Sequence, residues 1–328
     1  MIEIINYTSD WHDKLLTFMI YQFPNRTKDY LCWWIRQMER SLGNKRALLA
    51  IEDGKIVGCT TAVYTKIKIC DKEYPTYWEC NTIVDRRQRG RGIGRMLYEG
   101  MNRYEDRITA GFTKAAWKIQ PQIMKKFNEL ASVNVYISAN IWCIKTIFDA
   151  LIHKDKVHFN APVLLRVSNC LFKKVSSVKE IPIPNDGYWL GNEVELIRDQ
   201  SFLYNRFEDI YRKYVVYQGF VGNSFVGYFV VRATSLYGIP MLTLVDYRGI
   251  YSDFFKLVRL ALNNIAFKNK MGFSIMLTSQ RETMLTWNPL TVRLRKRLNV
   301  ATSLPNITAD TNLLITSADS DLDFVYYL

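Results

Sequence analysis

A strand that runs into a glycine-rich turn and then into a helix constrains this chain more than any other feature of its sequence. Residues 74–85, YPTYWECNTIVD, are typical of a strand, and residues 86–97, RRQRGRGIGRML, contain five arginines and three glycines before helix-forming residues begin. Glycines can adopt positive φ and leave their backbone N–H groups exposed. A helix that starts at the last glycine adds unpaired amides and a favourable dipole. The stretch therefore predicts a binding site for a pyrophosphate-like anion.

Other glycine motifs do not fit the same residues. The stretch lacks the G-x-G-x-x-G spacing of dinucleotide-binding folds and the G-x-x-x-x-G-K-[ST] spacing of the P-loop. An arginine-glycine arm that binds nucleic acid is the alternative, but such arms are usually repeated and lie in disordered sequence. This stretch occurs once, between a strand and a helix, which favours the phosphate site.

Length and composition limit the classes of protein to which this chain can belong. The 328 residues predict two domains, and 48% hydrophobic residues suffice for large cores. The net charge of +13 suits an anionic ligand. Six cysteines without a C-x-x-C pair and three histidines give no local zinc spacing, so no metal site is predicted. Without a signal-peptide pattern at the start or an apolar run long enough to span a bilayer, we expect a cytoplasmic protein.

Short matches recur at a fixed offset along the chain. NTIVD at 81–85 matches LTLVD at 242–246, and Gly111-Phe112 matches Gly272-Phe273, both 161 residues apart. We interpret them as two copies of one strand-helix-strand unit and predict domains at residues 1–160 and 161–328. Asp53-Gly54 predicts a hairpin turn. The sequence also predicts helices over 120–132 and near 281–298.

The glycine-arginine stretch resembles a known family. It is similar to the R/Q-x-x-G-x-G/A signature of the GNAT N-acetyltransferase superfamily, which lies there between the fourth strand and the third helix. The resemblance implies an α/β (α+β) fold of two GNAT-like domains, each a mixed, mostly antiparallel sheet flanked by helices. It also implies acetyl-CoA as acyl donor, with the pantetheine arm along the strand at Ile83 and Val84. The main-chain amides implied to bind the pyrophosphate are those of Arg89, Gly90, Arg91, Gly92, Ile93 and Gly94.

The same resemblance suggests how the acyl group is transferred. An amine attacks the thioester directly, which requires a neutral amine and a proton donor for the thiolate. Glu79 is the candidate base; a salt-bridge partner is the other interpretation. The family often has a tyrosine on its fourth helix as proton donor, and Phe127 stands in the corresponding stretch. Tyr98, Tyr104 and Tyr136 are the candidates to replace it, and we carry Tyr136 forward as the catalytic tyrosine.

The second half lacks the glycine signature. Only Gly249 follows LTLVD, so we expect a degenerate domain that binds substrate or has a structural role. The predicted function is transfer of an acetyl group to a primary amine of a small molecule, an amino sugar or a peptide, and nucleic acid is not required as a partner. The alternative is a non-catalytic binding protein, or a relative that uses aminoacyl-tRNA, with a vestigial CoA loop. The expected lining of an acceptor cleft is Tyr204, Arg206, Tyr247 and Arg248.

Overall fold

The protein is described by a computed structural model. Its backbone contacts divide the chain into two compact units, one of residues 1–132 and 298–311 and one of residues 133–297 and 312–328. The predicted domain limit at residue 160 concerns the two proposed copies and stays a prediction. The residues described are 1–24, 26–40, 47–70, 72–103, 106–110, 113–124, 127–140, 159–184, 194–208, 214–236, 239–251, 253–279, 291–293, 298–304, 307–308, 311 and 313–319, without the side chains of 131, 132, 235, 236 and 298.

The first unit is built on a mixed sheet. Its strands follow the order β1-β2-β3-β4-β5-β15, and every neighbouring pair is antiparallel except β4 and β5, which are parallel. The hairpin predicted at Asp53-Gly54 is confirmed, because both residues have positive φ (49° and 72°) between β2 and β3. The strand bounds are β1 Glu3–Asn6, β2 Leu48–Glu52, β3 Lys55–Ile69, β4 Lys72–Val84, β5 Arg107–Ala110 and β15 Leu298–Thr302.

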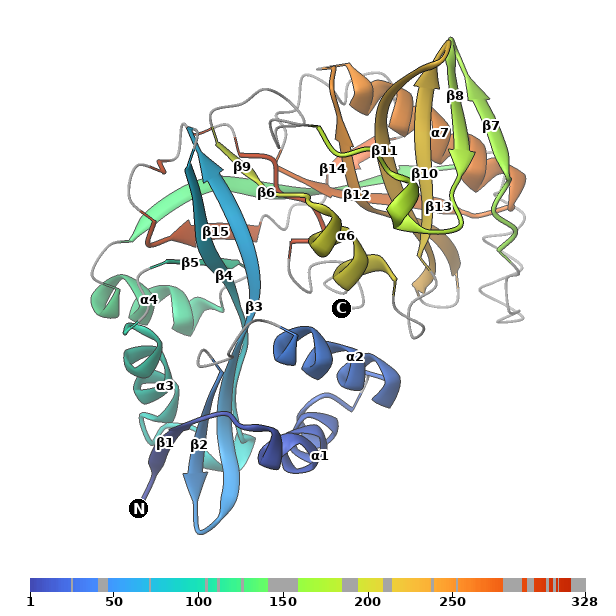
Figure 1. The fold of residues 1–328 in the computed structure, drawn as a ribbon. Helices are drawn as coiled ribbons and strands as arrows, with labels where there is room; N and C mark the ends of the chain where they lie inside the picture. Colours follow the sequence, from blue (N-terminus) through green and yellow to red (C-terminus); the bar gives the residue numbers. More distant parts are fainter. Residues whose placement is uncertain are drawn as a thin grey trace. The chain divides into compact units, whose positions relative to one another are not determined.

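Helices cover both faces of this sheet. In Figure 1, α3 and α4 lie on one side of the strands, and α1 and α2 lie on the other. The apolar side of α3 is buried against the sheet through Ile93, Leu97 and Met101, as its 3.6-residue spacing requires. The helix bounds are η1 Ser9–Trp11, α1 His12–Gln22, α2 Lys28–Glu39, η2 Arg86–Gln88, α3 Ile93–Met101 and α4 Lys114–Ile123.

The helix predicted over 120–132 is wrong. The helix there is α4, which starts earlier because the Thr113 hydroxyl accepts a hydrogen bond from the Ala116 N–H at 3.2 Å and so caps it. It ends at Ile123, two residues after Pro121. The strand β6 then runs from Asn128 to Ala139. The helix expected near 281–298 lies mostly outside the described residues, which show a short strand at 291–293 instead.

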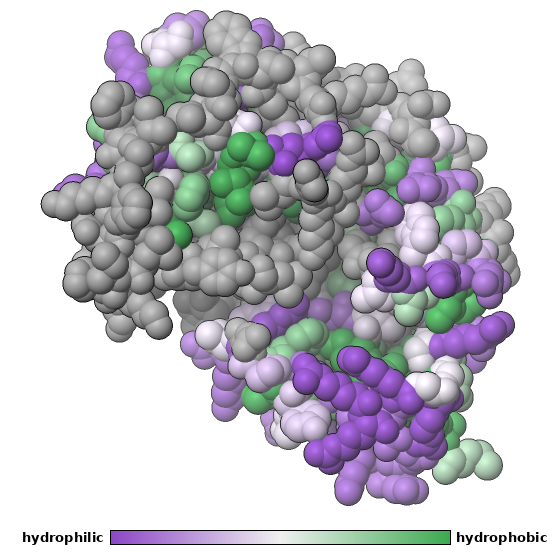
Figure 2. Space-filling view, turned by 180° about the vertical axis from the view of Figure 1, so that it is seen from behind, coloured by the Kyte–Doolittle hydropathy of each residue, from purple (hydrophilic) through white to green (hydrophobic). Residues whose placement is uncertain are grey.

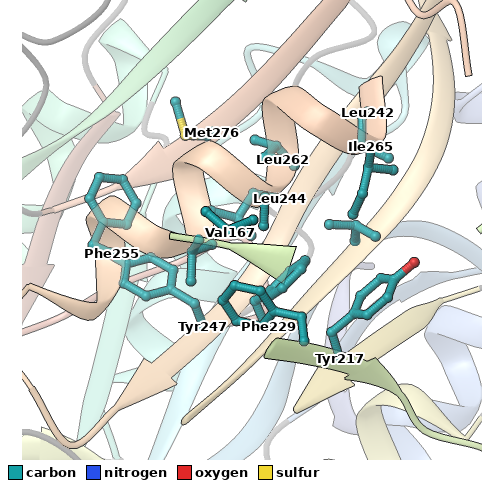
Figure 3. Close-up of a cluster of buried hydrophobic side chains, with 14 of the residues drawn as sticks. Val167, Tyr217, Phe229, Leu242, Leu244, Tyr247, Phe255, Leu262, Ile265 and Met276 are labelled. Carbon is teal, nitrogen blue, oxygen red and sulfur yellow. The ribbon is translucent and has the colours of Figure 1, made fainter. Parts of the chain in front are cut away.

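The second unit contains another mixed sheet, in the order β6-β13-β12-β11-β10-β8-β7, with β12 and β13 parallel. One of its apolar cores lies between the sheet and α7, where Leu262 and Ile265 lie near Leu242, Leu244 and Phe229 (Figure 3), and another includes Leu203 and Phe207 of α6. The remaining bounds are β7 Leu164–Val167, β8 Cys170–Lys174, η4 Val178–Glu180, β9 Val194–Leu196, α6 Gln200–Phe207, β10 Val215–Val221, β11 Ser224–Leu236, β12 Ile239–Gly249, α7 Phe254–Lys268, β13 Phe273–Thr278 and β14 Thr291–Arg293.

One topological unit occurs in both sheets. The strand β4 is followed by α3 and a parallel β5, and β12 is followed by α7 and a parallel β13. The segments NTIVD and LTLVD lie at equivalent places, towards the ends of β4 and β12. Gly111 and Phe112, one half of the second match, lie outside the described residues. That the two units are copies of one ancestor stays a prediction.

Candidate functional site: a glycine loop and the free edge of β4

The glycine-arginine stretch forms a short, well-anchored connection between β4 and α3. At the end of the strand, the Asp85 N–H donates to the Val57 carbonyl at 2.9 Å, and the Asp85 carboxylate accepts from the Arg87 N–H at 3.0 Å. After the single turn η2, Gly90 and Gly92 adopt φ of 85° and 80°. These left-handed conformations explain why glycines are needed at both positions.

The loop presents backbone N–H groups at the start of α3. Gly92 is the N-cap residue and has no side chain to cap the helix. The Met96 N–H bonds back to the Gly92 carbonyl at 3.1 Å, so the amides of the first helical turn have no partner within the helix. A Cβ placed on Gly90 or Gly92 would meet no described atom within 4 Å. The predicted anion site is therefore open and faces the positive end of the helix dipole.

The arginines of the loop have different surroundings. Arg91 makes a two-pronged ion pair with Glu52 at the end of β2, with N–O distances of 2.7 and 2.8 Å, and it also contacts Gln88. The pairing lowers the pKa of Glu52 and raises that of Arg91. Arg95 pairs with Glu99 one turn along α3 at 2.8 Å. Seen from behind, the surface over the lower part of the first unit is largely hydrophilic (Figure 2).

The same turn in the second unit is filled. At the end of β12, a Cβ on Gly249 would come within 2.3 Å of the Phe254 ring, and a Cβ on Gly227, which is opposite Gly249 on β11, would come within 2.8 Å of it. Both glycines therefore leave room for a buried phenyl ring and not for a ligand. This geometry agrees with the missing signature and supports the expectation that the second half has no coenzyme loop.

The strand β4 loses its β5 neighbour before it reaches the loop. Pairs between the two strands run from Tyr77–Arg107 to Glu79–Thr109. Beyond them β4 has a β-bulge, because two of its residues, Asn81 and Thr82, face the single residue Thr60 of β3. Ile83 and Val84, predicted to lie beside pantetheine, are half-buried and pair with β3 on the other side.

Glu79 is buried in a polar cluster beneath α3 and α4. Its carboxylate lies 3.2 Å from Arg107, and both side chains are at most 2% exposed. Gln120 and Thr82 donate to its Oε1 at 3.4 and 3.5 Å. Burial raises the pKa of Glu79, and the Arg107 charge opposes that shift. Sequence reasoning missed Arg107, because it lies 28 residues away along the chain and no local pattern marks it.

The candidate tyrosines occupy different places. Tyr98 of α3 is buried next to Glu79, and burial with the nearby carboxylate raises its pKa to about 12. Tyr136 lies on β6 in the apolar core of the second unit, and Tyr104 lies outside the described residues. Phe127 lies in the connection after α4, not on a helix, with its ring edge-on to Trp117 at 5.4 Å. Its proposed equivalence to a helical tyrosine is therefore wrong.

Three residues predicted to line an acceptor cleft are instead buried in the second unit. Arg206, Tyr247 and Arg248 are at most 4% exposed, whereas Tyr204 is half exposed beside Lys179. Arg206 donates to the Ala318 carbonyl at 2.9 Å.

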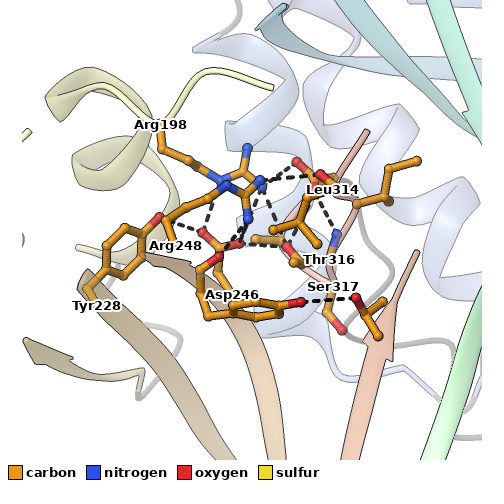
Figure 4. Close-up of polar contacts among 12 residues, drawn as sticks. Arg198, Tyr228, Asp246, Arg248, Leu314, Thr316 and Ser317 are labelled. Atoms are coloured by element: carbon orange, nitrogen blue, oxygen red, sulfur yellow. Dashed lines mark hydrogen bonds and ion pairs between the residues drawn. The ribbon is translucent and has the colours of Figure 1, made fainter. Parts of the chain in front are cut away.

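Arg248 belongs to a buried ionic cluster around Asp246 (Figure 4). Asp246 also accepts from Arg198, Tyr228 and Thr316, at 2.9, 2.8 and 2.6 Å. Although burial raises the pKa of Asp246, the two guanidinium groups more than offset it and hold the pKa below its usual value. This cluster fastens residues 314–319 to the sheet.

In the first unit, β4 thus continues beyond its pairing with β5 and leads through a glycine loop into the next helix of a mixed sheet flanked by helices. Residues 8–119 match the family described as acetyltransferase (GNAT) family, and this part of the chain belongs to that family. No curated protein matches the sequence. Within the described residues, no helix is long and apolar enough to cross a membrane, and no three metal-binding side chains form a cluster.

Solved structures share the fold over nearly the whole chain. A probable N-acyltransferase of unknown function from Enterococcus faecalis is 12% identical, with a TM-score of 0.61 over 92% of this chain and 72% of the other. A GCN5-related N-acetyltransferase from Anabaena variabilis is 10% identical (TM-score 0.58; 93% and 73% covered). Saccharomyces cerevisiae N-myristoyltransferase with bound myristoyl-CoA is 11% identical (TM-score 0.57; 92% and 82% covered).

Proposed function

We propose that this protein transfers an acyl group from acyl-CoA, with acetyl-CoA as the donor, to a primary amine of a small molecule, an amino sugar or a peptide. The observation that carries the proposal is the open loop at Gly90 and Gly92, where the first amides of α3 have no partner within the helix and lie at the positive end of its dipole, as an anion site requires. It lies within the residues that match the acetyltransferase family.

The residues present fit the coenzyme. The amides of Arg89–Gly94 would hold its pyrophosphate, and the free edge of β4 at Ile83 and Val84 offers backbone groups to the amides of pantetheine. The coenzyme supplies an acyl group activated as a thioester. Because Phe254 fills the equivalent turn of the second unit, one coenzyme site per chain is expected.

Proton transfer is assigned to the cluster beneath α3 and α4. Glu79 remains the proposed base; its raised pKa suits that role, and water must connect it with the amine because its side chain is buried. We propose Tyr98 in place of Tyr136 as proton donor for the thiolate. Its pKa near 12 keeps the hydroxyl protonated at neutral pH, and it lies beside Glu79.

Calorimetric titration tests the proposal directly. The purified protein is titrated with acetyl-CoA, myristoyl-CoA and free CoA, and we expect saturable one-site binding of acetyl-CoA. Tighter binding of myristoyl-CoA would instead indicate a long-chain donor, like the myristoyl-CoA bound to the yeast N-myristoyltransferase. No binding at millimolar ligand would refute the coenzyme loop. The net charge of +13 makes tRNA the next ligand to test, and steep salt dependence would identify it.

A further inference from the structure

Only half of the Asn81 side-chain amide is hydrogen-bonded among the residues that the structure describes. Its Oδ1 lies 3.4 Å from Nη1 of Arg26. Its Nδ2 is buried and makes no hydrogen bond within the described part of the chain. A guanidinium group can only donate, so the atom that faces Arg26 must be the amide oxygen. The orientation of the amide is thereby fixed, and a buried N–H pair left without an acceptor calls for an explanation.

Asn81 occupies a special place on β4. It lies two residues beyond Glu79, the last residue of β4 that pairs with β5. It is the residue of the β-bulge with positive φ, 51°, a conformation that asparagine tolerates better than most residues. The two neighbouring side chains of the bulge have different partners. Thr82 contacts Glu79 beneath α3 and α4, whereas Asn81 contacts Arg26 from the α1–α2 connection.

Arg26 is itself held in place. Its guanidinium lies over the rings of Phe23 and Tyr30, 4.1 and 5.1 Å from their centroids, and it donates to the Tyr30 hydroxyl at 3.2 Å. The positive charge of the Arg26 guanidinium beside Oδ1 draws electron density from the amide and makes Nδ2 a stronger hydrogen-bond donor. Arg26 therefore orients and polarises Asn81.

We propose that Nδ2 of Asn81 donates a hydrogen bond to the carbonyl oxygen of the bound thioester, with Arg26 as its positioning residue. This inference rests on the proposed function. The amine nitrogen bonds to the carbonyl carbon, and the electron pair of the C=O bond moves to the oxygen held by Asn81. When that pair returns, the C–S bond breaks, CoA leaves as the thiolate, and the proton lost by the amine passes to it. Such a donor acts where negative charge develops.

Two substitutions remove the Nδ2 donor of Asn81, one with the side-chain shape kept and one with the side chain deleted. Asn81→Asp keeps the shape and places a carboxylate beside Arg26, whereas Asn81→Gly keeps the positive φ without strain and deletes the side chain. Asp53→Gly is the matched control, because Asp53 also has positive φ (49°) but lies in the β2–β3 hairpin. Thermal unfolding checks that all three variants fold.

Two readouts are used. The first is the infrared carbonyl band of bound acetyl-CoA labelled with ¹³C at the acetyl carbonyl. The second is hydroxamate formation with hydroxylamine as acceptor. We expect the band to lie at lower wavenumber in the wild type and Asp53→Gly than in both Asn81 variants. Hydroxamate kcat should fall on the order of a hundredfold in both Asn81 variants, with the calorimetric Kd for acetyl-CoA changed by less than about threefold. Arg26→Lys should lose less than Arg26→Met.

The outcomes separate the two proposals. Acetyl-CoA binding with the same carbonyl band in wild type and Asn81→Gly overturns the role of Asn81 and leaves the proposed function standing. An Asn81→Gly variant with wild-type turnover does the same. If the wild type does not bind acetyl-CoA, both proposals fall. The infrared band decides the inference even where hydroxylamine is a poor acceptor.

Discussion

A carboxylate placed at Gly92 is expected to prevent coenzyme binding without disrupting the fold. A Cβ at this position meets no described atom within 4 Å, so the only structural cost is that of positive φ, 80°, about 1–2 kcal/mol for a non-glycine residue. That cost is present with and without ligand. Gly92→Glu and Gly92→Gln therefore carry the same strain and nearly the same bulk, and they differ in charge.

The size of the repulsion follows from Coulomb's law. At about 6 Å from a diphosphate with two negative charges, a carboxylate is repelled by about 1.4 kcal/mol at a dielectric constant of 80 and about 5.5 kcal/mol at 20. The affinity of Gly92→Glu should therefore be about ten- to ten-thousandfold below that of Gly92→Gln. Because the loop is exposed, the difference should shrink at high salt.

Calorimetry with acetyl-CoA at two salt concentrations measures this difference. Gly54→Glu is the control, because Gly54 also has positive φ (72°) with no described atom near its Cβ, in the β2–β3 hairpin. It should bind acetyl-CoA like the wild type. A folded Gly92→Glu protein with the same affinity as Gly92→Gln would refute the placement of the pyrophosphate.

Three further predictions concern charged groups. Asp246→Asn should lower the free energy of unfolding by about 3–5 kcal/mol in urea titrations, because it leaves buried guanidinium groups uncompensated. Since the pKa of Asp246 is lowered, its contribution to the free energy of unfolding is present above about pH 3.9 and is lost as the pH falls through the folded pKa. A urea midpoint of Asp246→Asn equal to that of the wild type would contradict the stabilising role. Glu79 has a raised pKa, so its contribution to stability is greatest below about pH 4.3 and declines as the pH rises through the folded pKa. If Glu79 is the base, the acyl-transfer rate should rise over that same range, and Glu79→Gln should lose this limb of the pH–rate profile; a retained limb would exclude the role. Arg89→Met should weaken acetyl-CoA binding more than Arg91→Met, because Glu52 already neutralises Arg91, and the reverse order would show that the ion pair opens on binding.

Local signals in the sequence predicted the loop well. The strand, the glycines and the start of α3 follow one another within about twenty residues, and positive φ at Gly90 and Gly92 agrees with the reason given for those glycines. The hairpin at Asp53-Gly54 was equally local. Such features depend on backbone preferences of the residues themselves and need no knowledge of distant contacts.

Long-range contacts account for what was missed. Residues 128–132 were predicted to end a helix, but they begin β6, whose later part pairs with β13, with Ala139 opposite Phe273. Likewise, no local pattern in the sequence predicted the ion pair of Glu79 with Arg107 or that of Arg91 with Glu52. The arginines assigned to an acceptor cleft turned out to hold the chain segment around 314–319, which no local pattern could reveal.

The position of β15 has a consequence for how the protein is made. This strand, Leu298–Thr302, pairs with β5, and the neighbouring Ser303 exchanges hydrogen bonds with the backbone of Arg107 at 3.0 and 3.1 Å. A nascent chain on the ribosome therefore cannot complete its amino-terminal sheet until residues 133–297 have already been synthesised. Until then, β5 is an uncovered edge open to pairing with other chains. Expression of residues 1–160 alone should accordingly give an aggregation-prone fragment. Fusing residues 298–311 to that fragment through a linker should restore its solubility.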